Sequence, residues 1–215
     1  MKFKILITVI CFSAALAIYS ELIGSGHFGY LKALTTILII QLPILFSDKE
    51  DKQFRNLIIT GLVFCLCGDI ILLNPKMFIY GLIAFLIAHL IFCYSFYQRN
   101  QNRFSFIYLI PFVLIGATYY WFLLPNLGSI TIPVAVYISV IVLMSWLAAE
   151  LYRTEKSSRH FAIFIGAILF LVSDSILAFN KFVTPFDYSG LLILSTYWVA
   201  IGLFALSTVR ENKKV

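Results

Sequence analysis

Charged residues are scarce in this chain of 215 residues, since Asp, Glu, Lys and Arg together make up only 12%. A soluble domain usually carries about 25%. Hydrophobic residues reach 61%, and a soluble domain of this length could not bury so much apolar surface. The composition therefore excludes an ordinary soluble domain and indicates a protein that spans a lipid bilayer.

Long polar segments are lacking too, and the longest polar loop covers only residues 47–55. The apolar runs are continuous and about 20 residues long, which excludes the short alternating strands of a β-barrel. Because backbone polar groups must be satisfied within each span, we predict an all-α polytopic membrane helix bundle of about eight transmembrane helices. It forms a single integral-membrane domain, 1–215. The predicted spans are 5–23, 31–46, 56–73, 77–97, 104–124, 130–152, 161–179 and 189–208. The first is too long for a cleaved signal peptide, so we expect it to be retained.

Motifs for metal binding and nucleophilic catalysis are also missing. The four cysteines lie inside apolar runs without a zinc-ligand spacing, and we expect them to be packing residues. There is no Gly-x-Ser-x-Gly, no His-Glu-x-x-His and no Gly-rich phosphate loop. We therefore predict no metal and no cofactor, and a conventional serine esterase is excluded.

The net charge of +6 reflects topology rather than a nucleic-acid partner. Thirteen of the 16 Lys and Arg residues lie on one side of the predicted membrane, and cytoplasmic loops retain such residues. They are Lys2, Lys4, Lys49, Lys52, Arg55, Arg99, Arg103, Arg153, Lys156, Arg159, Arg210, Lys213 and Lys214. Only Lys32, Lys76 and Lys181 lie on the other side. This bias predicts an even number of spans with both termini in the cytoplasm.

An internal repeat appears at an offset of 105 residues. Residues 61–72 align with residues 166–177, so that Gly61 matches Gly166, Asp69 matches Asp174, and an Ile-Leu pair coincides. The two segments belong to the third and seventh spans, which run in the same direction. They predict two parallel four-helix repeats. Chance similarity between two apolar helices is the alternative.

Asp69 and Asp174 are the principal candidates for chemistry, because charges inside spans are costly and usually functional. Each is predicted to lie four or five residues before the outward end of its helix, or about 6–8 Å below the hydrocarbon boundary. A carboxylate that only holds helices together is the alternative for either one. Two at matched depth favour a shared site, in which a coupled pair shares one proton and supplies one acid and one base.

Other polar residues gather on the same side of the membrane. Lys32 begins the second span and could bind a phosphate or merely anchor the interface. The remaining residues of this group are Glu21, His27, Asn74 and Asn180.

Deeper polar residues are expected to have supporting roles. Tyr197 should lie about 12 Å deep, where aromatic packing is the alternative to a site role. His89 should lie about 18 Å deep, too far to contact the aspartates. Glu150, near the cytoplasmic end of its span, is predicted to pair with Arg153 or to face solvent.

Several of these segments resemble the YhhN/TMEM86 family of lysoplasmalogenases. The resemblance rests on residues 68–73 (Gly-Asp-Ile-Ile-Leu-Leu), 81–90 (Gly-Leu-Ile-Ala-Phe-Leu-Ile-Ala-His-Leu), 170–182, Pro185, 195–198 (Ser-Thr-Tyr-Trp) and Lys32. It covers nearly the whole chain, including the eight-span layout. The chain departs from the family pattern at Ala33, usually proline, and at Trp198 and Ile201, where tyrosine and glutamine are common.

The resemblance implies a membrane hydrolase that cleaves the vinyl ether bond of lysoplasmalogens to a fatty aldehyde and a glycerophospho-alcohol. It implies Asp69 and Asp174 as the acid and base, with a lysophospholipid substrate in the bilayer. Residues implied to contact substrate are Lys32, Tyr197, Asn180, Glu21 and His89. We expect a multi-pass protein of a bacterial cytoplasmic membrane. The alternatives are a proton-coupled small-molecule or lipid transporter that uses the paired aspartates, and a structural membrane protein.

Overall fold

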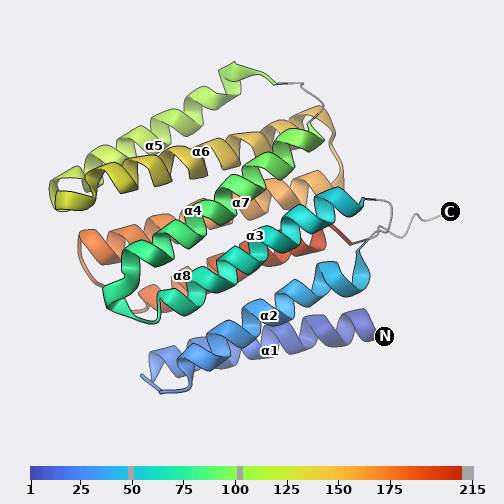
Figure 1. Ribbon diagram of the computed structural model, residues 1–215, viewed down its shortest axis with the longest axis horizontal. Coiled ribbons are helices and arrows are strands. Elements are labelled where there is room, and N and C mark those ends of the chain that lie inside the picture. The colour runs from blue at the N-terminus through green and yellow to red at the C-terminus, as the bar shows by residue number, and fades with distance from the viewer. Residues whose placement is uncertain (48–50, 101–103, 210–215) are drawn as a thin grey trace.

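The computed structural model describes residues 1–47, 51–100 and 104–209, and within these ranges the chain forms eight α-helices (Figure 1). They are α1 (Lys2–Leu22), α2 (Phe28–Phe46), α3 (Lys52–Ile71), α4 (Phe78–Arg99), α5 (Leu109–Leu123), α6 (Thr131–Thr154), α7 (Ser158–Phe182) and α8 (Ser189–Leu206). Four short 3₁₀ turns extend them at the connections: η1 (Pro75–Met77), η2 (Phe106–Tyr108), η3 (Leu124–Asn126) and η4 (Gly128–Ile130). Each helix overlaps one predicted span.

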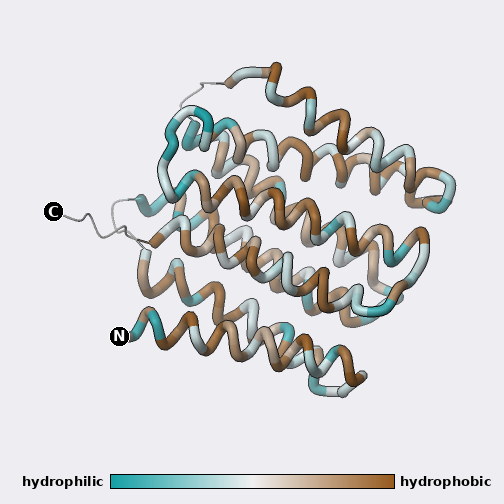
Figure 2. The backbone as a smooth tube through the Cα atoms, turned by 180° about the vertical axis from the view of Figure 1, so that it is seen from behind, coloured by the Kyte–Doolittle hydropathy of each residue, from teal (hydrophilic) through white to brown (hydrophobic). Residues whose placement is uncertain are grey.

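All eight helices, with their adjoining 3₁₀ turns, are long and apolar enough to cross a membrane, which confirms the predicted all-α membrane bundle. Hydrophobic residues run along the helices, and hydrophilic residues concentrate at the connections (Figure 2). Local side-chain bonds mark two of the helix starts. Ser157 accepts a hydrogen bond from the amide of His160 at the start of α7, and Asn74 accepts one from the amide of Lys76 before α4.

The two halves of the chain pack in the same order. In the first half α1 packs on α2, α2 on α3 and α3 on α4, while α5, α6, α7 and α8 follow the same sequence in the second. The halves meet where α8 packs against α2 and where α4 packs against α6. The fourth helix of each half thus contacts the second helix of the other, as two parallel four-helix repeats require. Helices α1 and α2 form one edge and α5 and α6 the other (Figure 1).

The repeated glycines allow close contact between neighbouring helices. A Cβ at Gly61 would collide with the ring of Phe92 on α4, and one at Gly166 would collide with the ring of Phe204 on α8. Both phenylalanines are fully buried, with ring centroids 4.8 Å apart at the centre of the bundle. Small residues serve this purpose in membrane helix packing, where close van der Waals contact drives association.

We expect Gly166→Ala to lower the melting temperature of the purified protein in detergent by several degrees. The added Cβ would lie 2.8 Å from the Phe204 ring and 3.0 Å from the backbone oxygen of Ala200, and such overpacking costs about 1–3 kcal/mol. Gly202→Ala is the matched control, because nothing lies within 4 Å of its Cβ position. Equal melting temperatures for the two variants would contradict this account.

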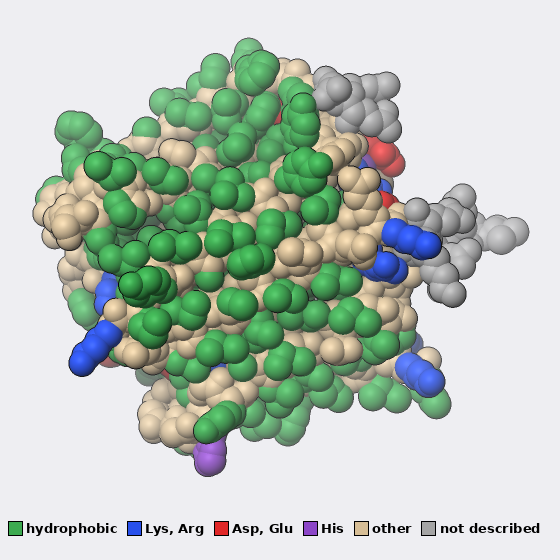
Figure 3. Space-filling view, in the orientation of Figure 1, with side chains coloured by type: hydrophobic (Ala, Val, Ile, Leu, Met, Phe, Trp, Pro, Cys, Tyr) green, Lys and Arg blue, Asp and Glu red, His purple; other side chains and the backbone are tan. Residues whose placement is uncertain are grey.

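Charged side chains lie mainly at the two ends of the bundle, with apolar side chains between them (Figure 3). At the end where α1 begins and α8 finishes, the fully buried Glu150 accepts hydrogen bonds from Arg153 at 3.0 and 2.8 Å and from the amide of Ser105 at 2.8 Å. Of the two partners predicted for Glu150, the structure confirms Arg153 and not solvent. Five cations of the topology prediction lie outside the described residues: Lys49, Arg103, Arg210, Lys213 and Lys214.

Candidate functional site

Asp69 is held where helices α2, α3 and α8 converge. Its side chain is 2% exposed, and its Oδ2 accepts hydrogen bonds from the Thr36 hydroxyl at 2.7 Å and from the Tyr197 hydroxyl at 2.8 Å. The Lys32 ammonium lies 3.3 Å from Oδ1. The carboxylate is therefore compensated by one cation and two hydroxyl donors.

Lys32 is enclosed with its partner and does not project from the rim of the bundle. Its side chain is only 11% exposed, and it starts one turn before Thr36 on the same face of α2. Thr36 in turn accepts a hydrogen bond from the indole nitrogen of Trp198 at 3.3 Å. The ion pair between Lys32 and Asp69 was not among our sequence predictions. Thr36 was not predicted as a site residue either.

Asp174 has a different environment, formed by α4, α6 and α7. Its Oδ2 accepts a hydrogen bond from the Tyr137 hydroxyl at 2.5 Å, and the Nε2 atom of His89 lies 3.8 Å away. His89 is fully buried, and neither ring nitrogen has a hydrogen-bond partner among the described residues. The same part of the chain places no Lys or Arg within 4.0 Å of Asp174.

The contact between His89 and Asp174 corrects the predicted depths. We expected both aspartates four or five residues before their helix ends, but Asp69 lies two residues before Ile71 and Asp174 eight before Phe182. Asp174 is therefore about 12 Å from its helix end, deep enough to face His89. The error came from ending the seventh span at residue 179, which overlooked the last turn of α7.

The two carboxyl groups belong to separate hydrogen-bond networks, and neither is a hydrogen-bond partner of the other in the described chain. Aromatic rings connect the networks. Tyr197 packs against Phe170 with ring centroids 5.5 Å apart, and Phe170 packs against His89 at 4.5 Å. Phe85 lies edge-on to both Tyr197 and Phe170.

The repeat relates the contacts of the two aspartates. Lys32 on α2 and Tyr137 on α6 are 105 residues apart, the offset that relates Asp69 to Asp174, and each contacts the aspartate of the following helix. Each aspartate also has a contact from a fourth helix, Tyr197 on α8 for Asp69 and His89 on α4 for Asp174. Thr36 on α2 adds one more contact to Asp69. Sequence reasoning did not select Tyr137, although applying the repeat offset to Lys32 would have found it. The second repeat thus has an uncharged phenol where the first has an ammonium.

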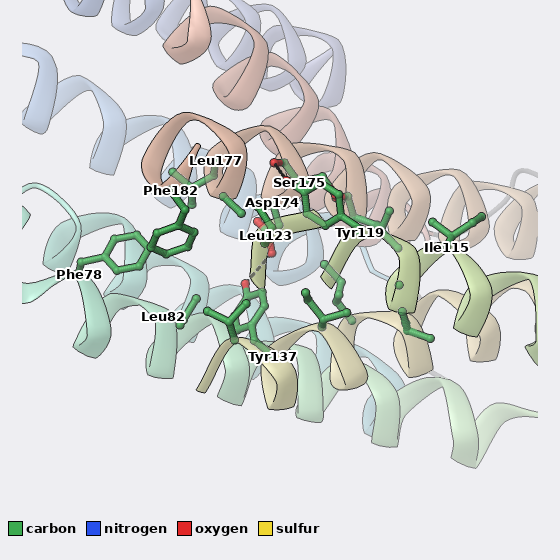
Figure 4. A pocket seen from close by; sticks show the side chains of 17 residues that line it. Phe78, Leu82, Ile115, Tyr119, Leu123, Tyr137, Asp174, Ser175, Leu177 and Phe182 are labelled. Atoms are coloured by element: carbon green, nitrogen blue, oxygen red, sulfur yellow. Dashed lines mark hydrogen bonds between the residues drawn. The ribbon is translucent and has the colours of Figure 1, made fainter. Parts of the chain in front are cut away.

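A cavity of about 130 Å³ lies between α4, α5, α6 and α7, and Asp174 is the one acidic residue among the described residues that line it. Its walls are otherwise mostly aliphatic and aromatic. In Figure 4 Asp174 and Tyr137 face each other across the middle, with Phe78 and Phe182 toward one end and Ile115 toward the other. Asp69 does not line this cavity.

Helix α5 closes one side of the cavity. It packs mainly on α6, and its Tyr119 hydroxyl donates a hydrogen bond to the backbone oxygen of Ser175 on α7 at 2.5 Å. Ile115, which also lines the cavity, is 58% exposed. The cavity therefore reaches the outer surface of the bundle beside α5, where lipid would surround the protein.

The remaining predicted site residues lie away from this cavity, at the connections between helices. Asn180 accepts a hydrogen bond from the amide of Phe186 at 3.1 Å and so shapes the turn between α7 and α8. The Glu21 carboxylate lies against Gly190 in the first turn of α8, where the helix dipole favours a negative charge. His27 is exposed in the turn before α2.

Comparisons with known proteins show which family this chain resembles. The YhhN family model matches residues 28–208. Lysoplasmalogenase TMEM86A of Bos taurus is 35% identical over 164 residues, which cover 74% of this chain and 67% of that protein. Lysoplasmalogenase TMEM86B of Rattus norvegicus is 33% identical over 145 residues, or 67% of this chain and 58% of that protein. Membrane protein YhhN of Escherichia coli O157:H7 is 28% identical over 169 residues, or 77% and 79%.

No solved structure matches the chain. The family match covers all of α2 to α8, including both aspartates and every residue that contacts them. The resemblance identified in the sequence is thereby confirmed. The chain is a multi-pass membrane protein and belongs to the YhhN family.

Proposed function

We propose that this protein is an integral-membrane hydrolase that cleaves the vinyl ether bond of lysoplasmalogen-type lysophospholipids. The products are a fatty aldehyde and a glycerophospho-alcohol. The main support is a single carboxyl group, that of Asp174, on the wall of an apolar cavity within the membrane-spanning bundle. The relatives named lysoplasmalogenase, at 33–35% identity, support the same substrate class.

The reaction begins with proton transfer to carbon. A vinyl ether accepts a proton at the vinyl carbon farther from the oxygen, and the electron pair of the double bond forms the new C–H bond. Among the described residues no Lys or Arg lies within 4.0 Å of Asp174, and an apolar wall of this kind favours the neutral carboxylic acid, the form that donates. We assign this step to Asp174, with the Tyr137 hydroxyl holding one carboxyl oxygen so that the other faces the substrate.

The later steps use the same carboxyl group. Once ionised, it lies beside the oxocarbenium ion and stabilises the positive charge. Water adds to the carbon next to the ether oxygen and gives its proton to the carboxylate, which yields a hemiacetal. Asp174 then protonates the glycerol oxygen as the C–O bond breaks. The hemiacetal hydroxyl gives its proton back to the Asp174 carboxylate, so the aldehyde forms and the carboxylic acid is restored.

Asp69 contributes by positioning in this proposal. Its bonds to Thr36 and Tyr197 and its ion pair with Lys32 hold α2, α3 and α8 together. Tyr197 packs on Phe170, which in turn packs on His89 beside Asp174. Both aspartates therefore support turnover, but Asp174 acts on the substrate and Asp69 acts on the shape of the site.

The proposed location follows from the charge distribution. The basic end of the bundle faces the cytoplasm, so the outer end of the cavity, near Phe78 and Phe182, lies toward the opposite leaflet. The substrate reaches the cavity from the bilayer. A bacterial cytoplasmic membrane is the proposed location.

The function is tested with purified protein in a nonionic detergent, given a lysoplasmenyl-ethanolamine, with aldehyde release followed over time. We expect aldehyde and glycerophosphoethanolamine in equal amounts. The saturated alkyl ether analogue should be inert, because it has no double bond to protonate. The parallel repeats also suit a proton-coupled transporter, which needs two sealed compartments. Transport by the protein in vesicles, with no aldehyde in detergent, would replace the hydrolase proposal.

A further inference from the structure

Lys181 is a cation at the rim of the cavity that contains Asp174. It belongs to the last turn of α7 and is followed by Phe182, which lines the cavity together with Phe78. The Lys181 ammonium lies 5.1 Å from the centre of the Phe78 ring, and the Phe78 and Phe182 rings are edge-on with centroids 5.7 Å apart. Lys181 is exposed and makes no ion pair with any residue that the structure describes. Its charge is therefore available to a ligand.

The position of Lys181 relative to Asp174 is set by the helix. Seven residues separate them, which is close to two full turns, so both lie on the same face of α7. Along the axis the separation is about 10.5 Å. A ligand that contacts Asp174 and extends toward the Phe78 end of the cavity therefore comes close to Lys181.

The proposed substrate has a matching dimension. Seven covalent bonds separate the vinyl carbon that accepts the proton from the phosphorus atom. At the rise per bond of an extended chain they span about 8–9 Å. With the vinyl carbon at Asp174, the phosphate reaches the level of Lys181, and the hydrocarbon tail continues toward Ile115 at the other end.

We propose that Lys181 binds the phosphate group of the lysophospholipid and so fixes the depth at which the vinyl ether meets Asp174. This assignment rests on the proposed function. It also replaces the phosphate role expected for Lys32, whose ammonium is paired with Asp69 and largely enclosed. The Phe78 ring holds the Lys181 ammonium near the mouth of the cavity through a cation–π contact, and the Phe182 ring packs edge-on against Phe78.

The test measures binding separately from turnover. The probes are 1-O-alkyl-glycerophosphoethanolamine, which has no vinyl group to cleave, and 1-O-alkylglycerol, which has the same tail and no phosphate. Both are titrated into protein in nonionic detergent. For Lys181→Gln we expect the Kd of the phospholipid to rise about tenfold, as for loss of a charge-assisted hydrogen bond, and the Kd of the alkylglycerol to stay unchanged. Lys181→Arg should keep most of the phospholipid affinity.

Lys76→Gln is the matched control, because it removes the same charge from the same end of the bundle and Lys76 does not line the cavity. It should bind both lipids as the wild type does. The proposal is overturned if Lys181→Gln binds the phospholipid with the wild-type Kd, or if it raises the Kd of both lipids by the same factor. It is also overturned if Lys76→Gln raises the Kd of the phospholipid as much as Lys181→Gln does.

Failure of the proposed function gives a different result. Phospholipid binding that depends on Lys181, with no aldehyde released from a lysoplasmalogen, would rule out the hydrolase proposal but support the phosphate site. Normal turnover with an unchanged KM in Lys181→Gln would rule out the phosphate site at Lys181 but support the hydrolase proposal.

Discussion

Asp174→Asn is expected to lower kcat for a lysoplasmalogen about a thousandfold, the scale of a lost general acid. Asparagine has nearly the same shape and can still accept the hydrogen bond from Tyr137. Its amide cannot deliver a proton to carbon, so the first step of the reaction stops. The measurement is aldehyde release under saturating substrate, with the melting temperature recorded in parallel.

Tyr137→Phe supplies the control for this prediction. It keeps the carboxyl group of Asp174 and removes only the hydroxyl that orients it, so a loss of about tenfold is expected, as for one neutral hydrogen bond. Substantial turnover by a well-folded Asp174→Asn protein would exclude Asp174 as the proton donor.

Asp69→Asn is expected to destabilise the protein by about 3 kcal/mol, because it leaves the ammonium of Lys32 enclosed without a counter-ion. Turnover should fall as well, since the bond that orients Tyr197 is weakened. Adding Lys32→Met to the same chain removes the unpaired charge. The double variant should recover most of the stability and much of the turnover.

Four proteins are compared, the wild type, the two single variants and the double variant, by melting temperature in detergent and by kcat. The coupling between the two substitutions measures the ion pair directly. A double variant as unstable as Asp69→Asn would show that the pair contributes little. A double variant that is stable but still inactive would assign Asp69 to the chemistry and contradict its positioning role.

The environments of the two aspartates explain why we expect such different responses. The half of the repeat that contains Asp69 has a lysine at the position where the other half has Tyr137. A carboxylate that is paired with a cation stabilises helix packing. The cation favours the ionised form, which has no proton to donate to a substrate. An uncompensated carboxyl group at an apolar cavity is suited to proton transfer. We therefore propose that the two repeats supply one structural site, at Asp69, and one reactive site, at Asp174.

Much of the architecture could be predicted because it depends on local properties of the sequence. Continuous apolar runs of about 20 residues form membrane helices whatever their neighbours, since each helix satisfies its own backbone. The repeat at residues 61–72 and 166–177 is also visible in the sequence alone, and it singled out both aspartates as candidate site residues. The resemblance to the YhhN family, carried by the same segments, was confirmed by the family match over residues 28–208.

The errors came from quantities that one helix alone does not determine. The depth of Asp174 depended on where α7 ends, and an apolar run does not mark that end within a turn. The separation of His89 from the aspartates was misjudged for the same reason. The partner of Lys32 could not be predicted, because an ammonium near a helix start pairs with whichever carboxylate the neighbouring helix presents.

By itself, the sequence determined that this is an eight-helix membrane protein, which family it belongs to, and which two carboxyl groups lie within its spans. Hydrophobicity and periodicity act along the chain, so they can be read without knowing the neighbours of any helix. Only the tertiary structure decided that Asp69 is paired with Lys32 while Asp174 faces a cavity, and that Lys181 lies at the rim of this cavity. Those outcomes depend on the relative orientation of helices from different parts of the chain. Side-chain packing between the helices determines that orientation.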